Sequence, residues 1–347
     1  MNKTPFLNLI KIILSLTFMC FILYYIYGKN PESIKRDLLL VDYKFVILSF
    51  VFGAWAYINR GLRWIILIDA LGYRASKINS IAAVSIGYFT NLFIPRAGEI
   101  SRCASLKKSD NIPVDKLFGT IIIERVIDFV ALIMFVVLII LLKSSDIIQS
   151  YHQYSNIEFP DPNYQPIILA LIGMVAIIIY LFKSKIKKLS FFKKIAGFID
   201  GLKTGLKSIK NIKNKTSFWL HTFNIWLMYF LMTYICFYAI PETVHLGMSD
   251  GLFLLVLGGI GMVIPAPGGF GSYHLLVMIG LIALNIAVPN DFLPLTFEKI
   301  ISGYNEYNAV MLFPFIVHTA QTFVAVIMGC FGLWVLTLSK KKSYAAS

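Results

Sequence analysis

The chain has 347 residues, of which 58% are hydrophobic and 14% are charged, and its formal net charge is +14. Soluble domains carry about 25% charged residues, so this composition excludes an ordinary soluble enzyme and indicates an integral membrane protein. The positive charge gathers between apolar segments. This favours retention of Lys and Arg on the cytoplasmic side of a membrane over binding to nucleic acid.

The cysteines and the common catalytic motifs give no sign of a metal or a cofactor. No pair of the four cysteines has metal-ligand spacing, and three of them lie inside apolar runs. The P-loop, metalloprotease and nucleophile-elbow motifs are missing from the sequence. We therefore expect no metal, no cofactor and no nucleic-acid partner.

Apolar runs of about 20 residues, the length that crosses the hydrocarbon core, recur along the chain. The first run has no small-residue cleavage site after it, so we expect it to be kept as a helix and not removed as a signal peptide. The predicted fold is an all-α polytopic membrane protein with about six full transmembrane helices, at residues 6–27, 45–68, 117–142, 166–182, 217–240 and 309–338.

Two other apolar segments are each interrupted by a Pro/Gly turn. The first break is Ile94-Pro95-Arg96-Ala97-Gly98-Glu99, and the second runs from Ile264 to Gly271. The second break begins 170 residues after the first. Non-helical backbone at membrane depth must be buried in protein or line a cavity. The two breaks therefore predict re-entrant hairpins, although 251–288 is also long enough for two short spans. One break in each half is typical of a transporter built from two repeats.

The charges of the loops set the predicted topology. The acidic segment 143–165 is expected outside, and the segment 183–215, with eleven lysines, is expected inside. The piece 78–106 then begins and ends on the cytoplasmic side, and 251–288 begins and ends outside. The two halves would form an inverted repeat, with both termini in the cytoplasm.

We expect a single membrane domain over residues 1–347. The apolar stripe of the basic segment predicts an amphipathic helix on the inner leaflet. The predicted parts are repeat one (1–142), an acidic outer loop (143–165), repeat two (166–338), which contains the basic amphipathic cytoplasmic segment 183–215, and a lysine tail (339–347).

Charged residues gather around the first break. Charges inside a membrane are costly unless they pair or face water. Arginine forks suit phosphate geometry, so we predict a buried cluster that binds one anionic headgroup. Its members are Arg60, Arg63, Arg96, Arg102, Arg125, Glu99, Glu124 and Asp128. The sequence leaves open that Arg60 and Arg63 are anchors at the headgroup level and that Glu124, Arg125 and Asp128 merely pair with one another.

The second break carries no charge and is predicted to be the close-packed half of the site. Glycines permit a close approach of backbone or substrate, and a histidine can titrate near neutral pH. The sequence does not decide whether the histidine carries protons or only makes hydrogen bonds. The candidate residues here are Pro265, Pro267, Gly268, Gly269, Gly271, His274 and Gln321.

Four motifs carry a family resemblance over nearly the whole chain. They are Asn59-Arg60…Arg63-Trp64, Asn91…Pro95-Arg96-x-Gly98-Glu99…Arg102, Glu124-Arg125…Asp128, and Pro265-x-Pro267-Gly268-Gly269-x-Gly271. Together they resemble the flippase-like family named after the membrane domain of lysylphosphatidylglycerol synthase. The resemblance implies a polytopic inner-membrane fold that handles a polar lipid, with Asn91 among its site residues. Many members have a Glu where this sequence has His274, and the aminoacyl transferase domain of some members is not expected here.

We therefore expect a translocator of an anionic or polar lipid, and not an enzyme, in the bacterial cytoplasmic membrane. Two alternatives stay open. One is a membrane-embedded transferase that modifies a lipid headgroup with Glu99, Glu124 or Asp128 as base. The other is a non-catalytic partner of an envelope-lipid enzyme. The expected partners are membrane lipids, such an enzyme, or a second copy of the chain.

Overall fold

The computed structural model describes residues 17, 31–154, 212–264, 266–284, 286 and 309–345. Within these residues every regular element is a helix. Three predicted features lie wholly or largely outside the described residues: the spans 6–27 and 166–182 and the basic segment 183–215.

Four of the described helices are long and apolar enough to cross a membrane. They coincide with four of the six predicted spans and confirm the all-helical membrane class. They are α3 (Tyr43–Ala70), α6 (Val114–Tyr154), α10 (Lys215–Tyr234), which the 3-10 turn η2 (Ile235–Ala239) continues, and α14 (Ala309–Ala345).

Two helical stretches lie outside the predicted spans. A short helix, α2 (Pro31–Leu38), precedes α3 between the first two predicted spans. Helix α6 continues to Tyr154, so the first half of the predicted outer loop 143–165 is helical. Between the two long helices of the second half, a turn η3 (Pro241–Thr243) follows η2.

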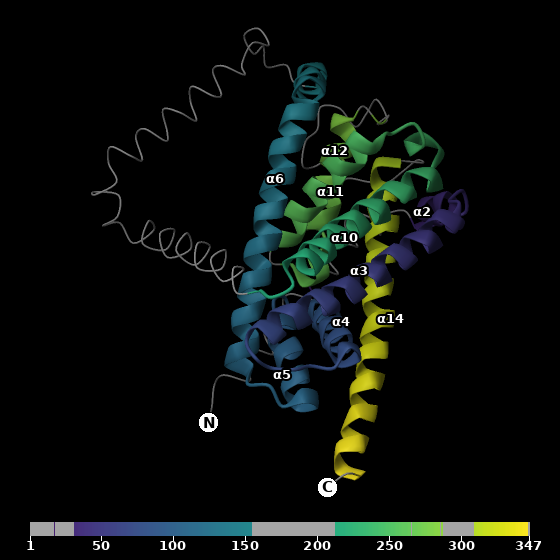
Figure 1. Ribbon diagram of the computed structural model, residues 1–347. Coiled ribbons are helices and arrows are strands. Elements are labelled where there is room, and N and C mark those ends of the chain that lie inside the picture. The colour runs from purple at the N-terminus through teal and green to yellow at the C-terminus, as the bar shows by residue number, and fades with distance from the viewer. Residues whose placement is uncertain are drawn as a thin grey trace, which may run out of the picture.

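Each break separates two short helices that pack side by side. The first hairpin consists of α4 (Lys77–Phe93) and α5 (Gly98–Asp110). The second consists of α11 (Met248–Val263), the turn η4 (Pro267–Gly269) and α12 (Ser272–Ala283). In each half of the chain a long helix, a hairpin and a second long helix follow one another (Figure 1).

Local chemistry ends α4 at the first break. Ile94 is extended (φ −127°, ψ 108°), because the residue before a proline is disfavoured in the helical region. Asn91 Oδ1 accepts a hydrogen bond of 2.7 Å from the Gly98 backbone N–H, which ties the two helices together at the tip. At the open end, the carboxylate of Asp110 accepts from the Ser76 N–H at 2.8 Å and from Asn79 Nδ2 at 3.0 Å.

Close backbone contact holds the first hairpin together, and it gives a prediction. A methyl group on Gly98 would overlap the carbonyl oxygen of Gly87 and lie 2.6 Å from the Asn91 amide nitrogen. We expect Gly98→Ala to lower the free energy of unfolding by about 2–3 kcal/mol, because neither backbone segment can move freely. The measurement is thermal unfolding of the purified protein in detergent.

Gly119 in α6 is the matched control, because a methyl group there has no atom within 4 Å. Gly119→Ala should leave stability unchanged or raise it by up to about 1 kcal/mol, since alanine is the better helix former. Equal melting shifts for the two variants would contradict the close packing of the first hairpin.

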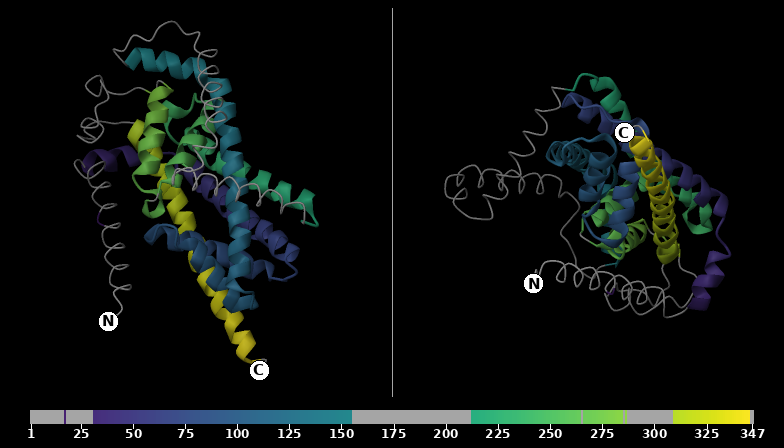
Figure 2. Two further views of the ribbon diagram at one scale, coloured as in Figure 1. Left: turned by 90° about the vertical axis from the view of Figure 1, so that its left-hand side faces the viewer. Right: turned by 90° about the horizontal axis from the view of Figure 1, so that it is seen from below.

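The two halves of the chain interlock. Helix α4 packs along α14, while α11 and α12 pack against α6 (Figures 1 and 2). Lys143 Nζ lies 2.7 Å from Asp250 Oδ1 and joins α6 to the first turn of α11. Each hairpin therefore packs against the last long helix of the other half.

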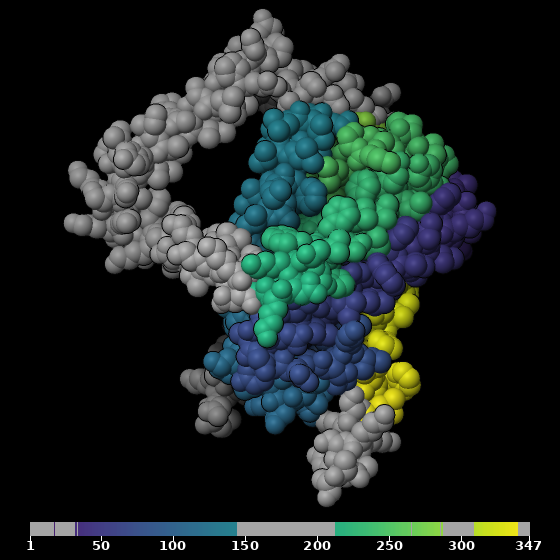
Figure 3. Space-filling view, in the orientation of Figure 1, coloured from purple at the N-terminus to yellow at the C-terminus, as the bar shows by residue number. Residues whose placement is uncertain are grey.

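The two breaks lie against each other in this arrangement. The turn η4 contacts α4, and a methyl group on Gly268 would lie 3.2 Å from Leu92 Cδ2. Helices α3 and α10 run side by side across the face that Figure 3 shows. The tips of the hairpins thus meet inside a frame of long helices.

Candidate functional site

A group of buried ionised side chains lies where α3, α5 and α6 meet. We call it the charged cluster, and its members are Arg60, Arg63, Arg102, Glu124 and Asp128. Arg63 is fully buried, Glu124 is 1% exposed, and the side chain of Asp128 is 11% exposed. The structure therefore brings together five of the eight charged residues that the sequence assigned to one site.

Asp128 joins the two arginines of α3. Arg63 grips it with both terminal nitrogens, with Nη1 2.7 Å from Oδ1 and Nη2 3.1 Å from Oδ2. Arg60 Nη1 donates to the same Oδ2 at 3.0 Å. Because Arg60 and Arg63 are held inside the protein, they are not anchors at the headgroup level.

Glu124 bridges α3 and α5 from one turn earlier on α6. Its Oε2 lies 2.7 Å from Arg102 Nη1, and its Oε1 lies 3.5 Å from Arg63 Nε. The spacing of four residues places Glu124 and Asp128 on one face of α6, as the sequence predicted. This face turns both carboxylates toward the arginines.

Aromatic side chains fix the arginines from the other side. The Arg102 guanidinium lies 3.7 Å from the centre of the Trp64 ring, and Trp64 Nε1–H donates to Thr120 Oγ1 at 2.7 Å. Arg60 Nε–H donates to the Tyr229 hydroxyl at 2.8 Å. The guanidinium carbon of Arg60 lies 5.6 Å from the ring centres of Tyr88 and of Tyr229. Cation–π contacts of this kind stabilise a desolvated cation.

Sequence reasoning missed Tyr88, Thr120 and Tyr229. Each lies in an apolar helix where an aromatic or hydroxyl residue gives no periodic signal. Asn59 is part of the family motif, but no partner for it was predicted from the sequence. In the structure, Asn59 Oδ1 lies 2.8 Å from His221 Nδ1 on α10. Helix α10 therefore takes part in the site, although the sequence predicted no charged residue on it.

Arg125 and Glu99 form a separate pair at the edge of the charged cluster. Arg125 Nη2 lies 2.9 Å from Glu99 Oε1, and the two side chains are 48% and 22% exposed. No ion pair joins Arg125 to Asp128 in the described part of the chain, because Asp128 pairs with Arg60 and Arg63. The Arg125–Glu99 pair instead links α6 to the first turn of α5.

Arg96 does not reach the charged cluster, contrary to the expectation from its place in the motif. It lies at the exposed tip of the first hairpin with a φ of 63°. It has no ion pair within the part of the chain that the structure describes.

This placement predicts a small effect for Arg96→Ala. The substitution breaks no ion pair among the described residues. The left-handed backbone at position 96 is as strained with alanine as with arginine. The free energy of unfolding should change by less than about 0.5 kcal/mol, as at other exposed positions. A melting shift as large as that of a cluster arginine would show that Arg96 has a structural role.

The candidate residues of the second break form a neutral group of their own. His318 Nε2–H donates to the Gly268 carbonyl at 2.9 Å, and the His318 ring lies 4.7 Å from that of His274. The Gly271 N–H donates to His274 Nδ1 at 3.4 Å, and Gln321 Nε2 donates to the Tyr273 hydroxyl at 3.4 Å. These contacts tie the second break to α12 and α14.

The glycines of the second break are needed for its backbone path. Gly268, Gly269 and Gly271 have φ values of 56°, 79° and 84°, which glycine adopts without strain. Pro267 is buried, and Pro265 lies outside the described residues. The hydrogen bonds of the second break join it to α12 and α14, whereas those of the charged cluster join α3, α5, α6 and α10.

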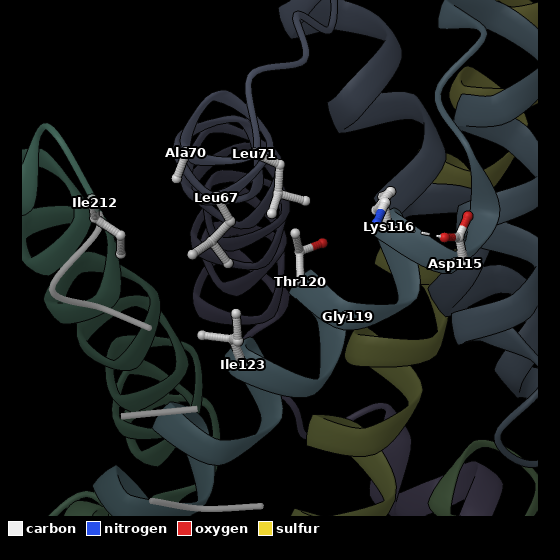
Figure 4. A pocket seen from close by; sticks show the side chains of 9 residues that line it. All are labelled: Leu67, Ala70, Leu71, Asp115, Lys116, Gly119, Thr120, Ile123 and Ile212. Carbon is white, nitrogen blue, oxygen red and sulfur yellow. Dashed lines mark ion pairs between the residues drawn. The ribbon is translucent and has the colours of Figure 1, made fainter. Parts of the chain in front are cut away.

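A cavity of about 240 Å³ is lined by residues of α3 and α6 and by Ile212 (Figure 4). Thr120 lines it and also accepts the hydrogen bond from Trp64, the ring on which Arg102 stacks. The other lining residues are mostly apolar: Leu67, Ala70 and Leu71 of α3, Asp115, Lys116, Gly119 and Ile123 of α6, and Ile212. Among the described residues, no group of three or more His, Cys, Asp or Glu side chains could hold a metal ion.

Comparison with known proteins identifies the family. The family described as "Lysylphosphatidylglycerol synthase TM region" matches residues 8–289. The chain belongs to this family. Both breaks and all five residues of the charged cluster lie inside the matched range, so the predicted resemblance is confirmed.

Two archaeal relatives are similar to this member of the lysylphosphatidylglycerol synthase TM family. A UPF0104 membrane protein of Methanocaldococcus jannaschii is 25% identical over 310 residues, which cover 80% of this chain and 85% of the relative. A UPF0104 membrane protein of Pyrococcus horikoshii is 24% identical over 281 residues, which cover 75% and 83%. No solved structure matches the chain.

Proposed function

We propose that the protein moves an anionic lipid between the leaflets of the cytoplasmic membrane and that the charged cluster holds the headgroup. One observation carries the proposal: three guanidinium groups are buried beside only two carboxylates in a membrane protein. Ionisable residues inside a membrane protein typically mark a ligand or ion pathway, and a buried ion pair is by itself weak evidence for a stabilising role. An anion is the ligand that this excess of positive charge selects.

The broken hairpins support a transport role. In the proposed topology the first hairpin enters from the cytoplasm and the second from outside, as an inverted repeat. Their tips meet at Leu92 and Gly268, which would separate the two sides of the membrane. A shift of one hairpin against the long helices would expose the charged cluster to one side at a time.

The apolar part of the lipid needs no charged site. The chains would stay in the bilayer or lie along the apolar cavity next to Thr120. This arrangement keeps the headgroup at the arginines and the chains at Leu67, Leu71 and Ile123. The family name and the resemblance to lipid-handling proteins agree with such a substrate.

A leaflet assay tests the proposal. The wild-type protein is reconstituted into vesicles that contain a phosphatidylglycerol labelled on one acyl chain, and a membrane-impermeant reductant bleaches the outer leaflet. We expect the protein to expose the inner pool faster than protein-free vesicles do. Unchanged kinetics with a folded, correctly inserted protein would contradict the proposal.

The same vesicles distinguish a translocator from a transferase. A translocator returns the labelled lipid with its mass unchanged, whereas a transferase alters the mass of the headgroup. Mass spectrometry of the extracted lipid, after incubation with a cytosolic extract, therefore decides between the two. A new lipid mass that depends on Glu99 or Glu124 would favour the enzyme.

A further inference from the structure

We infer that the headgroup held by the charged cluster carries one net negative charge, as a phosphodiester does, and that Arg102 is its anchoring residue. This inference rests on the proposed function. It adds two properties that the proposal leaves unspecified, the charge class of the lipid and the side chain that grips it. A diphosphate lipid would be excluded.

The charged cluster holds more positive than negative charge. Guanidinium groups stay protonated in proteins. The carboxylates of Glu124 and Asp128 each lie 2.7 Å from a guanidinium nitrogen and form ion pairs with it. The charged cluster thus holds three cations and two anions, and one positive charge is left in excess. The Arg125–Glu99 pair at its edge is neutral as a whole.

The excess positive charge of the charged cluster lies on Arg102. Asp128 is shared by Arg60 and Arg63 through three hydrogen bonds. Glu124 reaches Arg102 only through Nη1. Arg102 Nε and Nη2 are buried and have no hydrogen-bond partner among the described residues. Leaving charged donors buried without an acceptor is costly, so this edge of the guanidinium is suited to a ligand.

The edge of Arg102 formed by Nε and Nη2 is held in a fixed orientation. Nε and Nη2 lie on the same side of a guanidinium and form a fork that matches two oxygens of one phosphate. The stacking of Arg102 on Trp64 at 3.7 Å fixes the plane of the fork, and the bond from Trp64 to Thr120 fixes Trp64. The donors are therefore oriented before the lipid binds, which favours affinity.

The carboxylates beside Arg102 limit the ligand to one negative charge. Oε2 of Glu124 lies 2.7 Å from Arg102 Nη1, and Oε2 of Glu99, one turn earlier on α5, is buried without a hydrogen-bond partner among the described residues. A second phosphate group would have to lie near these carboxylates, whereas Arg60 and Arg63 are already paired with Asp128. Like charges at short range in a medium of low dielectric repel strongly. A phosphodiester balances the cluster, whereas a diphosphate does not.

A binding comparison in the wild-type protein tests the charge class. Native mass spectrometry in detergent measures binding of dioctanoylphosphatidylglycerol, with one negative charge, and of dioctanoylglycerol pyrophosphate, with the same tails and more than one. We expect the phosphodiester to bind at least tenfold more tightly. Equal affinity or a preference for the diphosphate would overturn the inference while leaving the proposed function standing. If neither lipid binds, the inference and the proposed function both fail.

Two variants test the residues. Glu124→Gln raises the excess positive charge to two, so it should move the preference toward the diphosphate by at least tenfold, a gain that misfolding cannot produce. Arg102→Lys keeps the charge but loses the fork and should weaken the phosphodiester at least tenfold. An unchanged preference in the first variant would overturn the charge balance. Wild-type affinity in the second would overturn the assignment of Arg102.

Discussion

Replacing Arg63 with alanine is expected to lower the free energy of unfolding by about 3–5 kcal/mol, the cost of breaking a buried ion pair from one side. Arg63 is fully buried and touches both carboxylates of the charged cluster, at 2.7 Å for Asp128 and 3.5 Å for Glu124. Its removal takes two charge-assisted hydrogen bonds from Asp128, which then keeps only the one from Arg60. Thermal unfolding in detergent measures the change.

Arg125→Ala is the matched control for this prediction. Arg125 is also an arginine paired with a carboxylate, but its side chain is 48% exposed. Exposed pairs contribute less than about 1 kcal/mol, so the melting temperature should barely move. A small shift for Arg63→Ala, or equal shifts for both variants, would show that the charged cluster is open to water in the folded protein.

Replacing Arg102 with glutamine is expected to slow lipid transfer about 100-fold. The fork of Nε and Nη2 would make two charge-assisted hydrogen bonds to the phosphate, and each such bond contributes about 1.5 kcal/mol or more. A loss of about 2.8 kcal/mol corresponds to a factor of 100. The leaflet assay with labelled phosphatidylglycerol, at lipid levels below saturation, measures the rate.

Lys108→Gln is the control for the transfer assay. Lys108 lies on the same helix, α5, and carries the same charge, but it is exposed on the surface. Its loss should change the transfer rate less than twofold. If Arg102→Gln transfers lipid at the wild-type rate while remaining folded, the headgroup is not held by this arginine.

Local features of the fold were accessible from the sequence. The length of the apolar runs predicted α3, α6, α10 and α14 within a few residues at most ends, because crossing a bilayer fixes the length of a helix. Pro95 and the glycines near it predicted the first break, because proline cannot continue a helix. The end of α6 was missed because its extension to Tyr154 runs into a polar stretch.

The sequence predicted only in part which charged residues pair with one another in the site. Spacing along α6 placed Glu124 and Asp128 on one face, and spacing along α3 did the same for Arg60 and Arg63. Sequence distance could not show that Arg125 turns toward Glu99 or that Arg96 ends on an exposed turn. Those outcomes depend on how the hairpin tip is oriented against α6, which is a tertiary property.

The lipid that the protein retains through gentle purification is the most direct test of the account. Mass spectrometry would compare lipid bound to the wild-type protein with the bulk membrane extract and with lipid bound to Arg102→Gln. We predict that the wild type is enriched in an anionic phosphodiester lipid and that the variant loses this enrichment. A wild-type protein whose bound lipid matches the bulk membrane, or is mainly a diphosphate lipid, would contradict the account.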